Sequence, residues 1–465
     1  MLFNTPQFFA FLAVVLILFY SAPRSWRKYI LLAASYFFYM SWIPKFILLL
    51  LTLTAIDYTA ARWIARTSSP GARKAALIVS LCANLGLLGF FKYYNFFAAN
   101  IAHLLDRPSN AFAFSIILPL GISFHTFQSM SYVIDVYRRE QEPIRNPIDY
   151  ALFISFFPQL VAGPIVRAHE FFGDLYHWRR PSSDEVLRGL LLVLLGLAKK
   201  VVLADQFAQI ANGYFQNVTK HPGMVPAWSG VIAFGIQIYF DFSGYTDMAI
   251  GMARLLGFHF PVNFRRPYLA SSITDFWHRW HISLSRWLRD YLYIPLGGNR
   301  HGKLQTYRNL MLTMLLGGLW HGASWNFVVW GGYHGALLSV ERMFRRGEKP
   351  ASERWTWSYP LQAIVTFALV MVGWVFFRAT TFHDSLYVLQ QMFLAPHGGL
   401  LIPRWERILA AITLLLAVLE EKKEWFEKIA IGPAWAYGAA CALLLLSVEL
   451  LGFTEAAVPF VYFQF

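Results

Sequence analysis

Charged side chains are scarce in this chain of 465 residues, because Asp, Glu, Lys and Arg together make up 14% of it. Soluble domains carry roughly 25%. Cysteine is scarcer still, with Cys82 and Cys441 both in apolar segments, which excludes a disulfide framework. Walker A, dinucleotide-binding glycine and GxSxG motifs are missing, so a transport ATPase, a Rossmann enzyme and a serine hydrolase lack support.

Hydrophobic residues account for 57% of the chain, and apolar runs recur along nearly all of it. At about 20 residues for each crossing, the length allows about 10–12 transmembrane or re-entrant helices. We therefore expect an all-α, multi-pass membrane protein whose residues 1–465 form a single domain. The apolar runs predict helices over residues 7–21, 29–41, 46–61, 75–95, 224–257, 309–340, 360–378, 405–419 and 432–452.

Two further apolar segments are interrupted by proline and glycine. Residues 112–135 contain Pro119 and Gly121, and residues 156–165 contain Pro158, Gly163 and Pro164. Such residues free backbone groups that other helices or water must satisfy. A re-entrant segment that lines a cavity and a plain kinked helix are both compatible with these patterns.

The net charge of +14 follows from 40 basic and 26 acidic residues. The basic loops at 24–28 and 62–74 alternate with a nearly neutral turn at 41–45. The positive-inside rule explains this pattern without nucleic acid and places the N-terminus outside the cytoplasm. The first residues lack the features of a cleaved signal peptide, so we expect the first span to be retained.

A basic, Trp-rich segment at 276–285 and the glycine-rich run at 317–322 carry the two histidines of greatest interest, His281 and His321. An ionisable residue in an apolar run is costly and therefore indicates function. A neutral imidazole can accept a proton from a hydroxyl and return it to a leaving group. The alternative for each is a hydrogen-bonded histidine with a structural role.

Histidine spacing also raises the question of a metal site. His278 and His281 are three residues apart, which on a helix would put them on one face. The thirteen histidines are otherwise scattered, whereas zinc sites need four ligands, so we expect no metal.

Residues 263–308 contain eight basic and two acidic side chains. This excess has two explanations. It can reflect topology alone, or it can form an entry site for a phosphate-bearing acyl donor, since arginine recognises phosphates well. In the preceding apolar run, Asp241 and Asp247 need a polar interior or a donor of their own.

Four ordered blocks, Pro158–Ile165, Tyr239–Gly251, Pro261–Asn299 and Arg308–Trp330, resemble the membrane-bound O-acyltransferases. The resemblance is to the bacterial branch with alginate O-acetyltransferase subunits, peptidoglycan O-acetyltransferases and the teichoic-acid D-alanyl transferase. It implies a helical bundle with a central funnel and tunnel, and it assigns catalysis to His321 and His281. Further residues expected along the tunnel are Trp277, Trp280, Ser285, Arg289, Trp320, Asn326, Asp241 and Asp247.

The resemblance also implies the reaction. An acyl group, most simply acetyl, would pass from a cytoplasmic thioester such as acetyl-CoA or an acyl carrier to an exported polysaccharide such as alginate. No bound cofactor is expected. A periplasmic acetyltransferase would complete the transfer outside the bacterial inner membrane. A polysaccharide transporter and a lipid acyltransferase remain as alternatives.

The last eight residues, Val458–Phe465, are strongly aromatic. They resemble the C-terminal tail of the small partner protein in the teichoic-acid D-alanylation system. One hypothesis is that the hydroxyl of Tyr462 receives the acyl group before handing it on. The other is that the tail is an aromatic anchor at the membrane interface.

Overall fold

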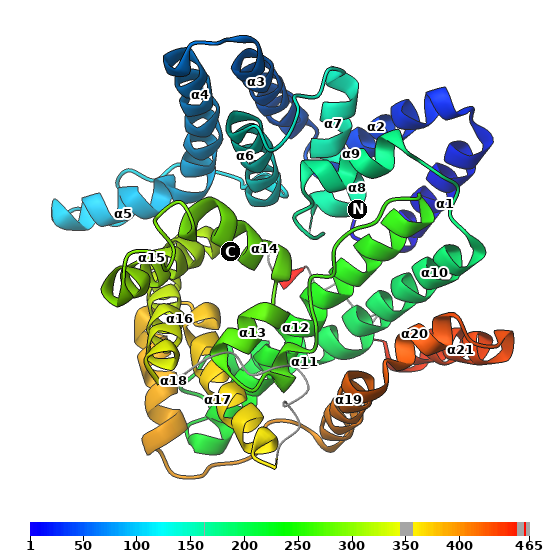
Figure 1. The fold of residues 1–465 in the computed structure, drawn as a ribbon. Helices are drawn as coiled ribbons and strands as arrows, with labels where there is room; N and C mark the ends of the chain where they lie inside the picture. Colours follow the sequence, from blue (N-terminus) through cyan, green and yellow to red (C-terminus); the bar gives the residue numbers. More distant parts are fainter. Residues whose placement is uncertain (162, 345–356, 453–459, 462–465) are drawn as a thin grey trace. The chain divides into compact units, whose positions relative to one another are not determined.

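The computed structural model describes residues 1–161, 163–344, 357–452 and 460–461. These residues form helices and connecting segments, and none of them lies in a β-strand, which confirms the all-α prediction (Figure 1). Within them, four helical segments are long and apolar enough to cross a membrane: Pro44–Arg66, Pro70–Leu104, Tyr359–Arg378 and Ala434–Leu451. The total number of crossings stays a prediction.

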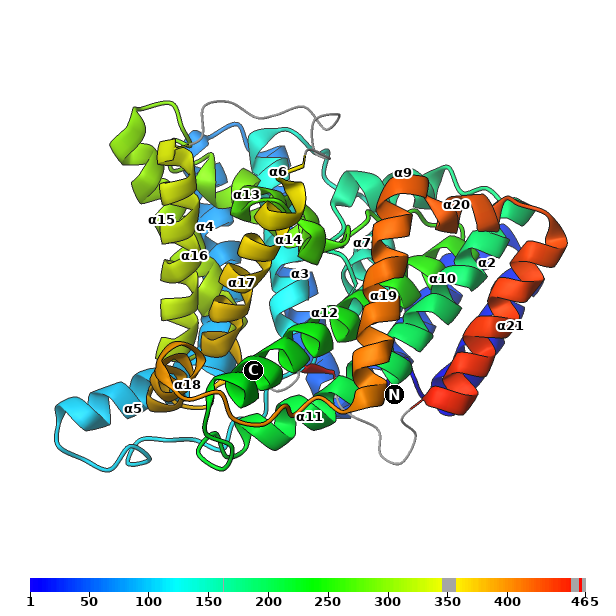
Figure 2. The same cartoon turned by 90° about the horizontal axis from the view of Figure 1, so that it is seen from below.

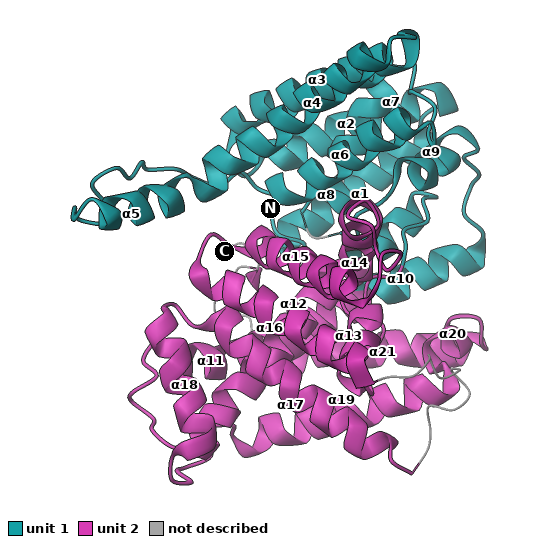
Figure 3. Ribbon diagram, turned by 60° about the vertical axis from the view of Figure 1, so that its left-hand side comes forward, with its two compact units in different colours: residues 1–193, 248–261 teal, residues 194–247, 262–465 magenta. Residues whose placement is uncertain are grey.

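The chain divides into two compact units, shown in different colours in Figure 3. Unit 1 comprises Met1–Val193 and Met248–Pro261, and unit 2 comprises Leu194–Asp247 and Val262–Phe465. Two of the three divisions fall inside helices, α10 (Ser183–Ala198) and α12 (Met224–Leu255), and the third follows Pro261. Whether the whole chain folds as one domain stays a prediction.

Unit 1 contains the N-terminal helices. In chain order they are α1 (Pro6–Ser21), α2 (Arg24–Met40), α3 (Ile47–Arg66), α4 (Pro70–Leu88), α5 (Tyr94–Leu104), α6 (Ile122–Arg138), α7 (Pro147–Ser155), α8 (Phe157–Leu160) and α9 (Ala168–Tyr176). Helices α3, α4 and α6 pack against one another. Asp57 on α3 is fully buried there and accepts hydrogen bonds from Ser80 Oγ at 2.6 Å and Asn84 Nδ2 at 2.9 Å, both on α4. An acidic residue in an apolar helix is thus satisfied by its neighbours.

Helix α6 begins later than the apolar run suggests. Gly121 precedes it with φ = 67°, a left-handed conformation that glycine adopts at little cost. A Cβ atom at Gly121 would lie 2.2 Å from the carbonyl oxygen of Leu160. The interruption expected in the segment 112–135 thus falls at Gly121, where the chain turns and touches α8, and the helix runs only from Ile122.

The segment 156–165 is also broken. Helix α7 ends at Ser155, Phe156 has an extended ψ of 113°, and α8 forms a single short turn. The described residues of the segment, 156–161 and 163–165, are all buried. The structure therefore favours an interrupted, buried segment over a continuous kinked helix, and its placement relative to a membrane stays a prediction.

Unit 2 contains the helices that carry the predicted site. They are α11 (Asp205–Phe215), α13 (Ile273–Arg279), α14 (Ile282–Leu288), α15 (Lys303–His321), α16 (Trp325–Phe344), α17 (Tyr359–Arg378), α18 (Phe382–Leu394), α19 (Arg404–Lys423), α20 (Trp425–Ala430) and α21 (Ala434–Leu451), with most of α12. A π-helical turn, Lys199–Ala204, links α10 to α11.

The run 309–340, expected as one span, is a hairpin of α15 and α16 that lie side by side (Figures 1 and 2). The two backbones approach closely at glycines. A Cβ at Gly318 would lie 2.2 Å from the carbonyl oxygen of Phe327, and one at Gly331 would lie 2.3 Å from that of Met314. Close helix approach at small residues is therefore what fixes the end of α15, where His321 stands.

Candidate functional site

His281 stands at the junction of α13 and α14, where the chain turns sharply. Its φ of 43° and ψ of 54° are left-handed, an uncommon conformation for a residue other than glycine. The side chain is fully buried, whereas His278 is exposed. The two histidines do not share a helix face, because α13 ends at Arg279 before the second one is reached.

Asn263 holds this junction in place. Its side-chain oxygen accepts hydrogen bonds from Ser283 N at 3.0 Å and Ser283 Oγ at 2.9 Å, and lies 3.3 Å from Nδ1 of His281. Its backbone carbonyl accepts a further bond from Ile282 N at 2.9 Å. Asn263 is fully buried. A strained backbone supported on several sides is a common feature of functional positions.

The indole of Trp320 brings the two predicted catalytic histidines together. Its ring centroid lies 6.1 Å from that of His281 and 4.9 Å from that of His321. His321 is the last residue of α15 and is 3% exposed. The two histidines, 40 residues apart in the sequence, thus belong to one aromatic cluster within unit 2.

His321 is enclosed by rings from the neighbouring helices. Trp330 of α16 lies 5.1 Å and Phe377 of α17 lies 5.2 Å from its ring centroid. The indole N–H of Trp330 is buried and has no hydrogen-bond acceptor within the described part of the chain. A buried donor of this kind beside an imidazole is available to an oxygen atom of a substrate.

Trp277 and Trp280 extend the aromatic cluster. Trp277 packs against Trp330 at 5.8 Å, and Trp280 packs against Trp374 of α17 at 5.0 Å. His334, which the sequence analysis did not single out, is fully buried with its ring 4.9 Å from that of Trp330. The rings of this cluster exclude water from most of the space around His321.

Asp241 belongs to a buried ionic cluster. Lys200 Nζ lies 2.7 Å from Asp241 Oδ1 and 2.7 Å from Asp205 Oδ1, and the three side chains are at most 2% exposed. The other oxygen of Asp241, Oδ2, accepts a hydrogen bond from the backbone N–H of Val461 at 2.6 Å. The sequence analysis expected Asp241 to need a polar interior or a donor, and it did not identify the donor Lys200 or the second carboxylate, Asp205.

The two described residues of the C-terminal tail, Phe460 and Val461, lie inside unit 2. Phe460 and Val461 are fully buried, and the ring of Phe460 lies 4.6 Å from Tyr245 and 5.6 Å from Phe242. The ring of Phe242 in turn lies 4.7 Å from His281. The tail thus reaches the histidine cluster through one phenylalanine, and Tyr462 itself lies outside the described residues.

The remaining predicted positions have structural contacts of their own. Asp247 pairs with Lys199 at 2.5 Å, and Asn326 Nδ2 donates to the carbonyl of Ala379 at 2.8 Å, at the end of α17. Ser285 Oγ donates weakly to the carbonyl of Trp280 at 3.4 Å. Arg289 pairs with its neighbour Asp290 at 2.7 Å, and its side chain is 59% exposed.

Part of the basic segment 263–308 is neutralised by acidic residues. Arg279 pairs with Asp275 at 3.0 Å and with Glu421 of α19 at 2.9 Å, and Arg266 pairs with Glu421 at 2.5 Å. These arginines hold α19 rather than presenting free charge.

The described residues contain no group of three or more His, Cys, Asp or Glu side chains that could hold a metal ion.

Comparison with known proteins matches this chain to one family model and to several bacterial acyl-transferring relatives. A model of the membrane-bound O-acyltransferase family matches residues 80–380. A probable alginate O-acetylase AlgI of Azotobacter vinelandii is 44% identical over 403 residues, covering 85% of this chain and 78% of the relative. A peptidoglycan O-acetyltransferase of Helicobacter pylori is 40% identical over 426 residues, covering 84% and 80%. A teichoic acid D-alanyltransferase of Bacillus subtilis is 30% identical over 296 residues, covering 59% and 71%.

Proposed function

Because this chain belongs to the membrane-bound O-acyltransferase family, we propose that it transfers an acetyl group from a cytoplasmic thioester for O-acetylation of an exported polysaccharide. The observation that carries the proposal is the shared contact of Trp320 with His281 and His321 in a buried aromatic cluster. Relatives named alginate O-acetylase and peptidoglycan O-acetyltransferase support a glycan acceptor, and alginate is the first polymer to test. The inner membrane is the site where a cytoplasmic donor and an exported acceptor meet.

His321 serves as the general base. Its imidazole takes the proton of the attacking hydroxyl while that oxygen bonds to the thioester carbonyl carbon, and the proton then goes to the departing thiolate. General bases of this kind contribute typically 10²–10⁴-fold to rate. His281, held by the Asn263 contact, orients the carbonyl.

The carbonyl oxygen gains negative charge in the tetrahedral intermediate and needs a hydrogen-bond donor. The indole N–H of Trp330 is such a donor, since it is buried beside His321 with no acceptor in the described part of the chain. The surrounding rings of Trp277, Trp280 and Trp320 keep water away and so protect the thioester from hydrolysis.

The tail supplies a route to the outside. In the first step the Tyr462 hydroxyl attacks the thioester, forming a tyrosyl ester and releasing a thiol. In the second step a polysaccharide hydroxyl, or a nucleophile of a periplasmic acetyltransferase, attacks that ester and regenerates Tyr462. The burial of Phe460 and Val461 near His281 supports this order of events.

The experiment that tests the proposal follows radiolabelled acetyl-CoA with the purified protein in liposomes. The label released from coenzyme A is divided into protein, lipid and added polysaccharide fractions, for the wild type and for Tyr462→Phe. We expect label on the wild-type protein and much less on the variant. Full acetyl transfer by Tyr462→Phe would overturn the relay, with the family reaction still intact.

The same fractions separate the alternatives. Label in lipid without any polymer present would support a lipid acyltransferase. No consumption of acetyl-CoA, combined with passage of polysaccharide across the liposome membrane, would support a transporter.

A further inference from the structure

Unit 1 contains a second basic site, separate from the residues considered so far. A cavity of about 390 Å³ is lined by four arginines, Arg179, Arg180, Arg188 and Arg254, together with Glu185 and His259. The arginines come from the loop before α10, from α10 itself and from the end of α12. Arg254 lies 66 residues beyond Arg188, so the sequence alone does not show that it shares a site with the three arginines at 179, 180 and 188.

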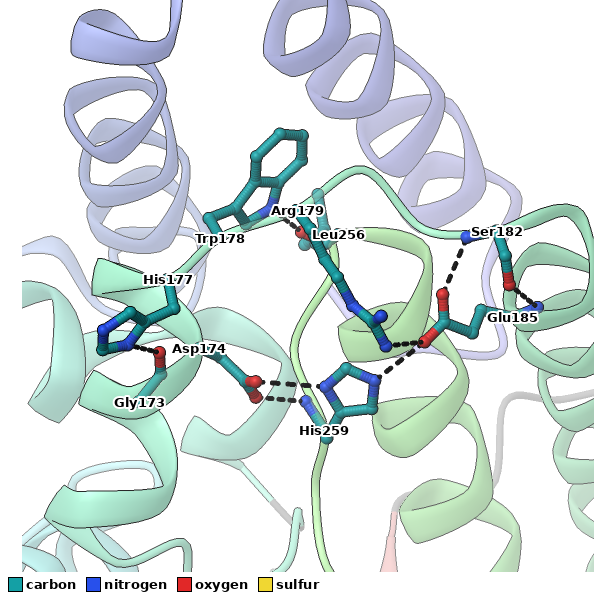
Figure 4. Close-up of polar contacts among 9 residues, drawn as sticks. All are labelled: Gly173, Asp174, His177, Trp178, Arg179, Ser182, Glu185, Leu256 and His259. Carbon is teal, nitrogen blue, oxygen red and sulfur yellow. Dashed lines mark hydrogen bonds and ion pairs between the residues drawn. The ribbon is translucent and has the colours of Figure 1, made fainter.

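The wall of the cavity is held by a set of hydrogen bonds (Figure 4). The His259 ring lies between two carboxylates, with Nδ1 3.1 Å from Asp174 Oδ1 and Nε2 3.2 Å from Glu185 Oε1. Trp178 Nε1 donates to the carbonyl of Leu256 at 2.8 Å. These contacts join the loop 177–182 to the segment 254–259, so the cavity is formed in advance of any ligand.

Glu185 is already occupied by the protein. Its carboxylate accepts hydrogen bonds from Ser182 N at 2.7 Å and Arg179 Nη2 at 3.2 Å, besides its contact with His259. The Ser182 backbone N–H is the main cause that lowers the pKa of Glu185, to about 2. Asp184 also lines the cavity and Asp174 lies behind His259, so four arginines stand against three acidic groups and the site keeps a positive balance of one charge.

The surroundings of the cavity are those of a membrane interface. Arg27 stacks on the Trp178 ring at 4.2 Å, and Arg180 lies over the Tyr20 ring at 5.8 Å, at the end of the apolar helix α1. Exposed aromatic rings stand on the neighbouring helices, with Trp26 63% and Tyr176 54% exposed. Amphipathic rings and basic residues gather where a bilayer meets water.

We propose that this cavity binds the phosphate of an anionic phospholipid headgroup at the cytoplasmic surface of the membrane. Arginine forks bind phosphate oxygens through paired, charge-assisted hydrogen bonds. Basic pockets on the cytoplasmic side of membrane proteins attract anionic headgroups in the same way. The phosphate group is the chemistry recognised, and the lipid is its source because aromatic rings and an apolar helix end border the site.

The test uses delipidated, purified full-length protein and native mass spectrometry. Phosphatidylglycerol and phosphatidylcholine are titrated separately onto the wild type, onto Arg180→Gln/Arg188→Gln, and onto Arg62→Gln/Arg66→Gln. The last pair removes the same charge from the C-terminal turns of α3 in unit 1 and serves as the matched control. Parallel titrations with inorganic phosphate and with coenzyme A test soluble sources of the same group.

We expect the wild type and the control to bind phosphatidylglycerol in preference to phosphatidylcholine. We expect the Arg180/Arg188 variant to bind it at least about tenfold more weakly, because two charge-assisted contacts are lost. Equal affinity of the variant and the wild type would overturn the site. Displacement of the lipid by millimolar phosphate or coenzyme A would overturn the lipid as the source.

Discussion

Asp241 Oδ2, on α12, accepts a hydrogen bond from the backbone N–H of Val461, with an N···O distance of 2.6 Å. Val461 lies 220 residues further along the chain. The same carboxylate is paired with Lys200 at full burial. Hydrogen bonds to charged groups are stronger than neutral ones, and stronger again where water is excluded. A buried charge therefore fixes the backbone of Val461, the residue before Tyr462.

Asp241→Asn is expected to loosen the tail, because a neutral amide oxygen is a weaker acceptor and Lys200 loses one of its two carboxylates. Hydrogen exchange of the C-terminal peptide should accelerate about tenfold, as charged hydrogen bonds exceed neutral ones by about 1–2 kcal/mol. Label transfer from acetyl-CoA should fall with it. Asp247→Asn is the control. Asp247 is on the same helix, and its side chain and that of its partner Lys199 are each 19% exposed. This substitution should change the exchange rate and the label transfer by less than about threefold. Equal exchange in the two variants would contradict the anchoring role.

Trp330→Phe tests the proposed oxyanion donor, since an aromatic ring is kept while the indole N–H is lost, and the control variant below accounts for the smaller ring. We expect kcat to fall by about 10²–10³, the usual loss for such a donor, with little change in KM. Trp374→Phe is the matched control, because its N–H already donates to Tyr268 Oη at 3.2 Å. Steady-state kinetics on both variants decides the point, and a kcat for Trp330→Phe equal to that of the control would exclude the role.

Gly318→Ala should destabilise unit 2, since the added Cβ would meet the carbonyl oxygen of Phe327 at 2.2 Å. Overpacking of this kind costs about 1–3 kcal/mol. Gly332→Ala on the partner helix would only touch a Leu315 methyl at 3.5 Å and should be neutral. Thermal unfolding in detergent compares the two, and similar melting temperatures would show that α15 and α16 can separate without cost.

The arginine-lined cavity predicts a pH effect on stability. The pKa of Glu185 is about 2 in the folded state and 4.5 in its ordinary state, so its contribution is present above pH 4.5 and is lost as the pH falls toward 2. The melting-temperature difference between wild type and Glu185→Gln should be constant from pH 7 to 5 and shrink below pH 4.5. Asp184→Asn, the exposed neighbour, is the control. A difference that stays unchanged down to pH 3 would contradict the assignment.

Long apolar runs were enough to predict those helices that continue without a break from one end of the run to the other. The runs 224–257 and 360–378 correspond closely to α12 (Met224–Leu255) and α17 (Tyr359–Arg378). The hairpin break at Gly322 was not predicted, because it depends on the close approach of α15 and α16, whereas Pro119 and Gly121 did indicate an interruption before α6. Composition does not report such contacts.

The candidate site, too, could be predicted from the sequence only in part. His281 and His321 were identified from the sequence because ionisable residues are rare in apolar, Trp-rich surroundings. Asn263 and Lys200 were missed, since their importance lies in contacts with residues 18 and 41 positions away. The cavity of unit 1 was missed because Arg254 and His259 come from a segment at least 66 residues beyond its three other arginines.

The most direct test of the central claim measures turnover of radiolabelled acetyl-CoA by the purified protein in liposomes. Wild type is compared with His321→Ala and with His125→Ala, a buried histidine of unit 1 that serves as the matched control. We expect His321→Ala to lose at least about 10²-fold in release of coenzyme A, in line with loss of a general base, and His125→Ala to retain activity if folded. Equal turnover by His321→Ala and the wild type would contradict catalysis by this histidine.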